Sequence, residues 1–119
     1  MSERNEQELL IDIIESIEKI YRYIAGLSFE EFIDDEKTLD AVVRNFEIIG
    51  EAANRISQDF KRKHQSVEWR RIIGLRNRIV HEYFGIDYQV IWEIIRTKLI
   101  DFKVQIKQIS DIEPKKNPL

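Results

Sequence analysis

The side chains best suited to chemistry lie in one short stretch, which reads RNRIVHEY and starts at Arg76. It holds an arginine, an amide side chain and a histidine, at Arg76, Asn77 and His81. Arginine can bind a phosphate through two parallel hydrogen bonds, and histidine can exchange protons near neutral pH. We therefore predict chemistry on a phosphodiester, in which Arg76 stabilises negative charge and His81 transfers protons. Asn77 is expected to orient His81 or a phosphate oxygen.

The helix expected around this stretch breaks its own apolar pattern at Arg76. At about 100° per residue, Arg76 lies near the centre of an apolar arc. The arc consists of Trp69, Ile72, Ile73, Leu75, Ile79, Val80 and Tyr83. A guanidinium in that position must pair with a carboxylate, or face a cavity or a partner chain, because an unpaired buried charge is very costly. Asn77, His81 and Arg70 share the flank beside it, where Gly74 leaves room for a backbone or a ligand.

A second polar residue, Asn45, interrupts the apolar arc of the preceding helix. A buried amide needs hydrogen-bond partners, so Asn45 either bonds to a neighbouring helix or supports the Arg76–His81 pair. His64 is the only other histidine and is expected to be exposed in a basic loop, and the chain has no cysteine. Two histidines without thiolates or clustered carboxylates make a poor metal site. We expect neither a metal nor a cofactor.

Apolar residues recur at helical spacing along nearly the whole chain, which predicts an all-α protein. Four main helices and a short one after Ser28 are expected, the main ones at about residues 6–25, 37–62, 67–83 and 88–110. Gly26 is expected just past the first helix, and N-caps are expected at Ser28, Asp34-Asp35, Ser66 and Asp87. Short connections favour an antiparallel bundle. We expect one domain over residues 1–112, followed by a flexible tail, residues 113–119, that holds both prolines.

The net charge of −3 is unevenly distributed. From Lys61 to Arg78 the chain has seven Lys or Arg and one acid, so this segment carries +6 and the remainder −9. A local positive field on an acidic body is typical of a nucleic-acid contact. Candidate RNA-binding residues are Lys61, Arg62, Lys63 and Arg70, and a merely solvated helix face is the alternative.

The N-terminus is charged, and no run approaches the roughly 20 apolar residues of a membrane span. With no cysteine, a disulfide framework is excluded. We expect a cytoplasmic protein without a membrane partner.

The flanks of the motif add a resemblance. The form Arg, four residues, His, one residue, Tyr, with Gly74-Leu75 before it and 84–87 (FGID) after it, resembles the signature of the HepT-like ribonucleases of the HEPN superfamily. Residues 26–32 (GLSFEEF) and 44–53 (RNFEIIGEAA) also look like stretches of this family, and the likeness runs from about residue 8 to 102. Glu82 stands where a small residue is common, and Leu99-Ile100 where relatives often have proline.

The resemblance implies a helical homodimer whose cleft holds both copies of the motif and cuts RNA without a metal. It also implies a toxin of a type VII-like toxin–antitoxin pair, whose antitoxin is a minimal nucleotidyltransferase that silences the toxin by attaching AMP to Tyr83. A physical argument also favours a dimer: one protomer has one motif histidine, and a two-fold axis brings a second. The alternatives are a non-catalytic RNA- or nucleotide-binding helical dimer and a structural partner of the antitoxin.

Overall fold

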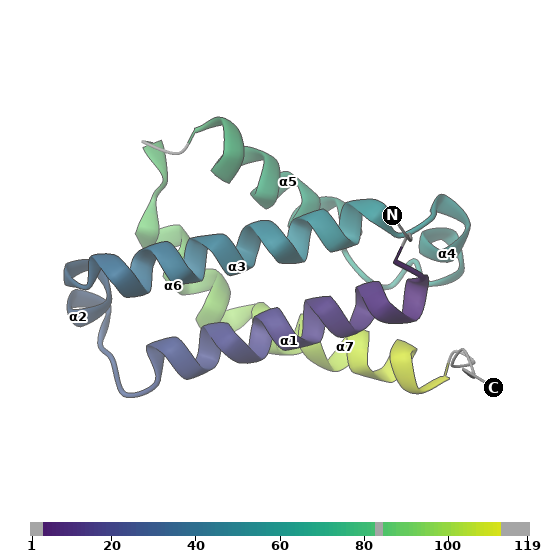
Figure 1. Ribbon diagram of the computed structural model, residues 1–119, viewed down its shortest axis with the longest axis horizontal. Helices are drawn as coiled ribbons and strands as arrows, with labels where there is room; N and C mark the ends of the chain where they lie inside the picture. The colour runs from purple at the N-terminus through teal and green to yellow at the C-terminus, as the bar shows by residue number, and fades with distance from the viewer. Residues whose placement is uncertain (1–3, 83–84, 113–119) are drawn as a thin grey trace.

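The computed structural model describes residues 4–82 and 85–112. Within them the chain forms seven α-helices and no β-strand, which confirms the all-α prediction (Figure 1). The helices are α1 (Glu6–Ile24), α2 (Phe29–Asp34), α3 (Glu36–Arg55), α4 (Gln58–Lys63), α5 (Trp69–His81), α6 (Tyr88–Thr97) and α7 (Leu99–Ile112). Tyr83 and the expected tail lie outside the described residues.

Side-chain caps begin several helices where the sequence predicted them. Ser28, Asp35 and Asp87 each accept a hydrogen bond from a backbone N–H in the first turn of the helix that follows. These bonds satisfy N–H groups that a helix start leaves unpaired. Gly26, just past α1, has a φ of +78°, which glycine adopts without strain.

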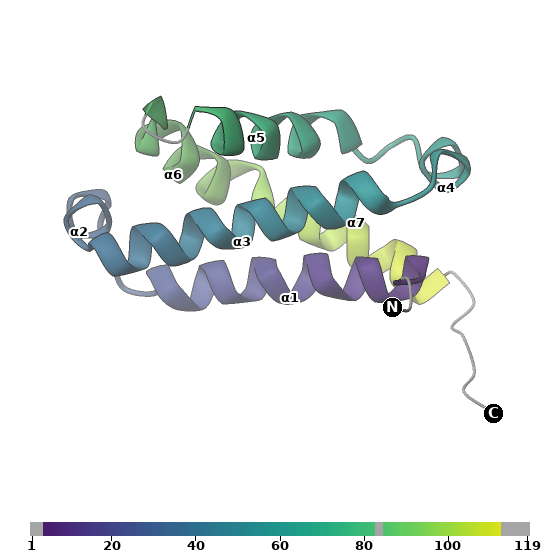
Figure 2. The same cartoon turned by 45° about the horizontal axis from the view of Figure 1, so that its top comes forward.

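Helix α3 has neighbours on several sides. It packs along α1 and along α5 and contacts the short α2, while α7 packs against α1. In Figure 2, α5, α3 and α1 are stacked from top to bottom, and successive members run in opposite directions. α5 therefore rests mainly on α3 and lies at the edge of the molecule. No helix in the described ranges is long and apolar enough to cross a membrane.

The helix expected over residues 37–62 is two helices. α3 ends at Arg55, Ile56 is extended, and α4 begins after Ser57. The Ile56 side chain is buried at 2% exposure, and the Ser57 hydroxyl caps α4 by accepting from Phe60 N–H. The backbone N–H of Ser57 also donates to the Glu6 carboxylate at 3.3 Å. These tertiary contacts override the continuous apolar pattern.

The helix expected over residues 88–110 is also broken, at Lys98, between α6 and α7. Just before the break, the Thr97 hydroxyl donates to the Glu93 carbonyl at 2.7 Å. Hydroxyl back-bonding of this kind bends helices. The new direction lets α7, which starts at the buried Leu99, pack against α1.

Helix α5 begins at Trp69 rather than directly after Ser66. Glu68 occupies the N-cap position and makes no side-chain capping bond. The His64 carbonyl accepts hydrogen bonds from the Val67 N–H at 3.3 Å and the Trp69 indole N–H at 3.1 Å. Val67 and Trp69 are both buried, and their packing stabilises this turn. The helix therefore begins at Trp69 and not at Val67.

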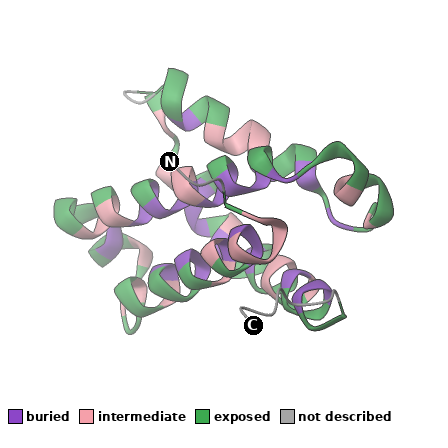
Figure 3. Cartoon of the chain, turned by 45° about the vertical axis from the view of Figure 1, so that its right-hand side comes forward, coloured by how far each residue is buried: buried purple, intermediate pink, exposed green. Residues whose placement is uncertain are grey.

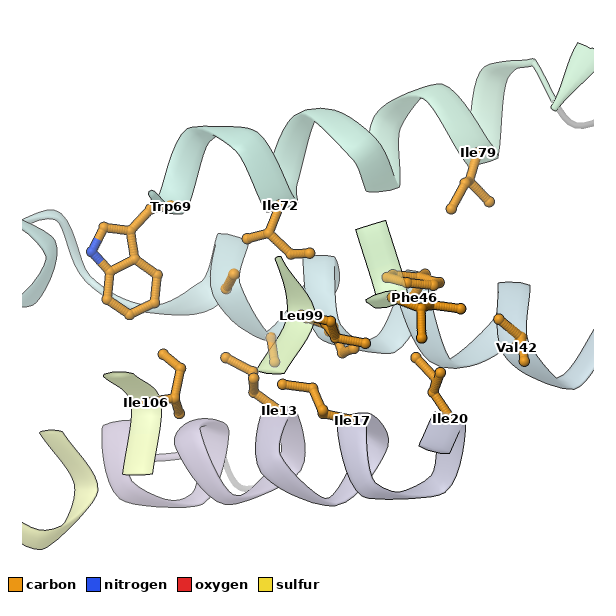
Figure 4. Close-up of a cluster of buried hydrophobic side chains, with 14 of the residues drawn as sticks. Ile13, Ile17, Ile20, Val42, Phe46, Trp69, Ile72, Ile79, Leu99 and Ile106 are labelled. Atoms are coloured by element: carbon orange, nitrogen blue, oxygen red, sulfur yellow. The ribbon is translucent and has the colours of Figure 1, made fainter. Parts of the chain in front are cut away.

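Isoleucine, leucine and aromatic side chains fill the core between α1, α3, α5 and α7 (Figure 4). Ile13, Ile17 and Phe46 are fully buried there. Trp69 and Trp92 are both buried in this core. Figure 3 shows the buried residues along the inward faces of the helices, with exposed residues on the outward faces. This packing fixes the orientation of α5, which carries the candidate residues.

Candidate active site

The flank of α5 that the spacing singled out faces outward. Arg70, Asn77 and His81 are exposed, and Gly74 is half-buried. A Cβ added to Gly74 meets nothing within 4 Å, so the open space predicted at Gly74, two turns before His81 on this flank, is present among the described residues. The opposite side of α5 holds the buried residues Trp69, Ile72 and Ile79.

Arg76 lies at a close approach of α5 to α3. A Cβ added to Gly50 of α3 would overlap the Cβ of Arg76 and stand 3.2 Å from the Ile72 carbonyl oxygen. A residue without a side chain is therefore what lets the two helices come this near. The Arg76 side chain is 28% exposed, so it packs on α3 and still reaches solvent at one side.

Two side chains hold the Arg76 guanidinium. Its Nη2 lies 2.8 Å from Oε2 of Glu51, and its Nη1 donates to Oδ1 of Asn77 at 3.0 Å. Of the alternatives that the sequence left open for Arg76, the structure shows pairing with a carboxylate. A guanidinium has more N–H donors than these two contacts use, so Arg76 retains donors for a phosphate.

Sequence reasoning assigned no role to Gly50 or Glu51. A signal was present, because Gly50 is a glycine inside a long helical pattern, which often marks a packing or functional constraint. What the pattern could not supply is the register of α3 against α5, which places Glu51 rather than another carboxylate beside Arg76.

Arg76 and His81 leave α5 in different directions. Five residues along an α-helix correspond to a rotation of about 140° and a rise of about 7.5 Å. Arg76 is accordingly packed on α3 while His81 is exposed. Asn77 links the two sides, because it accepts from Arg76 and stands one turn before His81 on the same flank. Within one protomer, Arg76 therefore lies on the side of α5 that faces α3, and His81 lies on its outward flank.

Asn45 is buried in α3, at 6% exposure. Its Nδ2 donates to the Ala41 carbonyl of its own helix at 2.8 Å, so the bond to a neighbouring helix is not formed within the described residues. Its Oδ1 is buried and has no hydrogen-bond partner in the same part of the chain. No hydrogen bond there joins Asn45 to Arg76 or His81.

The candidate RNA-binding residues occupy two places. Lys61, Arg62 and Lys63 end α4, which lies beyond the N-terminus of α5, at the opposite end from His81 (Figure 1). Arg62 pairs with Asp59. Burial lowers the pKa of Lys61, and the charge of Glu6 opposes that shift. The structure therefore does not bring this group together with Arg76 and His81.

Arg70 is the candidate cation best placed to meet a ligand. It is exposed on the same flank as Asn77 and His81 and forms no ion pair within the described ranges. Its neighbour Arg71, by contrast, lies 3.3 Å from a carboxylate oxygen of Glu68.

A hollow of about 340 Å³ opens beside Arg76, between α1, α3 and α5. Its charged lining is mixed in sign, with Arg44, Arg55 and Arg76 facing Asp12, Glu47 and Glu51. Arg44 lies 3.7 Å from Glu47, as Arg76 lies against Glu51, so much of this charge is paired internally.

A larger groove of about 1280 Å³ separates α5 from α6 and α7. Its apolar lining includes Ile72, Leu75, Val90, Ile94, Leu99, Phe102 and Val104. The α5 rim carries three arginines and one acid, Arg70, Arg71, Arg78 and Glu68. The α6–α7 rim carries three acids and one lysine, Asp87, Glu93, Asp101 and Lys98. The two rims therefore have opposite net charge.

The second histidine is not exposed as expected. His64 is half-buried and packs on Phe60, with ring centroids 4.7 Å apart. In the part of the chain that the structure describes, no group of three or more His, Cys, Asp or Glu side chains is placed to hold a metal ion.

A family model and several known proteins that match this chain are all described as ribonucleases. Residues 13–109 match the model of the family described as "Ribonuclease HepT-like". "Putative RNase TTE0752" of Caldanaerobacter subterraneus subsp. tengcongensis is 39% identical over 101 residues, which is 85% of this chain and 90% of that protein. "Probable ribonuclease HepT" of Thermococcus cleftensis is 38% identical, over 89% of this chain and 96% of that protein.

A third relative, "Putative RNase MJ0127" of Methanocaldococcus jannaschii, is 37% identical over 95% of this chain and 94% of its own length. No solved structure matches the chain significantly.

Proposed function

The chain belongs to the HepT-like ribonuclease family, and we propose that it is the ribonuclease toxin of a type VII-like toxin–antitoxin pair. It cleaves RNA phosphodiesters without a metal ion by means of Arg76 and His81. The observation that carries this proposal is the arrangement on α5, where the Arg76 guanidinium is held between Glu51 and Asn77 beside the exposed flank of His81.

The proposed reaction takes its nucleophile from the substrate. The ribose 2′-hydroxyl attacks the adjacent phosphorus, and the bond to the 5′ oxygen of the next nucleotide breaks, leaving a cyclic phosphate. A base must remove the 2′ proton, an acid must protonate the leaving oxygen, and a cation must stabilise the charge on the phosphorane-like transition state. His81 performs proton transfer, and Arg76 stabilises the charge.

This chemistry is better served by two protomers than by one. A single protomer supplies one motif histidine, although acid and base act at opposite ends of the scissile bond. Arg76 and His81 also diverge around α5 by about 140°. A two-fold axis beside the outer flank of α5 supplies a second histidine, because an isologous interface brings the same patch from both copies.

We propose that the second copy binds in the groove between α5 and α6–α7. Its apolar lining includes two exposed valines, Val90 at 46% and Val104 at 48%. In a two-fold contact, the basic α5 rim of one copy faces the acidic α6–α7 rim of the other, so the surface is complementary to itself. When the second copy binds in this groove, α5 of each copy lies close to the dimer axis.

Incubation of the purified protein with RNA in EDTA tests the activity. We expect cleavage in EDTA that disappears in His81→Ala and in Arg76→Ala, with both variants still helical. Cleavage that EDTA abolishes contradicts the metal-free mechanism. Binding without cleavage supports the alternative of a non-catalytic RNA- or nucleotide-binding module, and neither activity supports a structural partner of the antitoxin.

The antitoxin of the proposed pair is a minimal nucleotidyltransferase that transfers AMP to the hydroxyl of Tyr83. Tyr83 follows the last residue of α5 by two positions. Each adenylyl group adds a base and a negatively charged phosphodiester. Held near Arg76, that charge occupies the cation required by the substrate and repels RNA. The tyrosine hydroxyl is then needed for silencing but not for cleavage.

Co-expression with the partner tests this regulation. Mass spectrometry is expected to find AMP on Tyr83, and Tyr83→Phe is expected to cleave RNA and to resist the antitoxin. AMP on Tyr88 instead, or inhibition of Tyr83→Phe without any adenylylation, contradicts the assignment.

A further inference from the structure

The contacts of Arg76 point to a function for a residue on another helix. We infer that Glu51 of α3 is a positioning residue, which holds the Arg76 guanidinium in the orientation that receives the scissile phosphate. The inference rests on the proposed ribonuclease function and adds a residue of α3 to a site otherwise built on α5.

Arg76 is restrained at both ends. Its stem meets α3 at Gly50, where no side chain could be added without overlap. Its head is bonded on one side to Glu51 through Nη2 and on the other to Asn77 through Nη1. A planar guanidinium with partners at both Nη atoms has its plane defined. The edge that remains free is therefore presented in one direction.

A contribution to folding does not account for the pair. The Glu51 side chain is 48% exposed, and ion pairs exposed to that degree contribute little to stability. Orientation is a different matter, because misplacing a reacting group by about 1 Å can lower a rate about 100-fold. The physical value of Glu51 lies in the direction that it gives to Arg76.

Glu47 provides a matched control. It lies one turn before Glu51 on α3, lines the same hollow and pairs with Arg44 rather than Arg76. Removing either carboxylate changes the local charge by the same amount, and only Glu51 contacts Arg76.

The test compares Glu51→Ala and Glu47→Ala in steady-state RNA cleavage. We expect Glu51→Ala to lower kcat by roughly 10- to 100-fold without raising KM, because the lost negative charge does not weaken RNA binding. Glu51→Gln keeps an oxygen acceptor at the same reach and is expected to recover part of kcat. Glu47→Ala is expected to keep the kcat of the wild type. An unchanged or raised kcat in Glu51→Ala overturns the inference, and a raised one means that Glu51 competes with the substrate phosphate.

A second measurement separates this inference from the proposed function. In ¹⁵N NMR, rotation of the Arg76 guanidinium is expected to be slow in the wild type and in Glu47→Ala, and fast in Glu51→Ala. Slow rotation in Glu51→Ala overturns the inference whatever the cleavage assay shows. A wild type that cleaves no RNA overturns the proposed function, and the NMR comparison then still decides whether Glu51 orients Arg76.

Discussion

At the scale of single residues, Arg76 shows how a cation is accommodated next to a core. The centre of an apolar arc is a costly place for a charge. The Arg76 side chain avoids much of that cost because it is 28% exposed to solvent. A carboxylate from the neighbouring helix and an amide from its own helix hold its guanidinium. The result is a cation that is held in place and keeps free donors.

Asn45 is the opposite case, a buried polar group whose needs are only partly met. Its Nδ2 bonds to Ala41, but its Oδ1 is buried without a partner among the described residues. We expect Asn45→Leu to raise the free energy of unfolding by about 1 kcal/mol, because an unsatisfied buried acceptor costs about 1–3 kcal/mol. Thermal unfolding measures the gain.

RNA cleavage by Asn45→Leu shows whether the unsatisfied Oδ1 of Asn45 is retained for the function of the site. If Asn45 supports the site, Asn45→Leu is more stable and less active, which is a common trade-off. A variant that is less stable than the wild type means that the Oδ1 acceptor is satisfied in solution.

The sequence reveals these residues but not their partners. Spacing alone shows that Arg76 interrupts an apolar arc and that Asn77 and His81 share a flank, and the structure agrees. It cannot show that Glu51 is the carboxylate in question, because that depends on how α3 and α5 are aligned. Tyr83 stays a prediction, since it lies outside the described residues.

At the scale of helices, glycine decides how near α5 comes to α3. We expect Gly50→Ala to destabilise the protein by roughly 1–3 kcal/mol, because the added methyl group overlaps Arg76 and forces a shift. The displaced Arg76 is also expected to lose activity. Chemical denaturation measures the first effect and the cleavage assay the second.

Gly74→Ala is the matched control for this substitution. Gly74 is likewise inside a helix, but an added Cβ meets nothing within 4 Å. Alanine is therefore expected to stabilise the protein by about 0.5–1 kcal/mol, the usual gain over glycine in a helix. Equal effects of the two substitutions would mean that α3 and α5 do not approach closely at Gly50.

Helix boundaries mark the limit of prediction from periodicity. The local signals at Ser28, Asp35 and Asp87 are sufficient to begin a helix, because each cap bonds within its own first turn. The breaks at Ile56 and Lys98 depend on tertiary contacts that bury Ile56 at the first break and Leu99 just after the second. Because the apolar pattern continues through both positions, the sequence alone does not reveal that the helices end there.

At the scale of the whole molecule, fewer of the basic residues in segment 61–78 are free to bind RNA than their number indicates, because carboxylates pair with several of them. Arg71 is paired with Glu68, whereas Arg70 has no ion pair within the described residues. We expect Arg70→Ala to weaken RNA binding and to reduce the slope of log affinity against log salt by about 1, the effect of losing one phosphate contact. Arg71→Ala is expected to change the slope less. Binding titrations across salt concentrations measure both.

The cations of α4 are tested in the same titrations. Replacing Lys61, Arg62 and Lys63 by Glu is expected to weaken binding without changing the position of cleavage, because α4 is far from His81 (Figure 1). Affinity that does not depend on salt would identify these residues and Arg70 as a solvated surface only.

The groove between α5 and α6–α7 gives a prediction for the assembly. Val104 lines the groove at 48% exposure, so Val104→Glu has little to disturb within one protomer. In the proposed dimer the same position is covered by the second copy, where an unpaired carboxylate is costly. We expect the wild type to sediment as a dimer, and Val104→Glu to dissociate at least about 10-fold more readily, the effect of about 1.4 kcal/mol. Cleavage is expected to fall with the dimer fraction.

Ile11→Glu is the control for a charge placed on an exposed apolar residue. Ile11 is 39% exposed on α1 and does not line the groove. It is expected to leave both dimerisation and cleavage unchanged, because its surroundings stay solvated in the dimer. If Ile11→Glu dissociates the dimer as strongly as Val104→Glu, the second copy does not occupy the groove. If the wild type cleaves RNA as a monomer, one Arg76 and one His81 suffice, and the need for a second histidine is refuted.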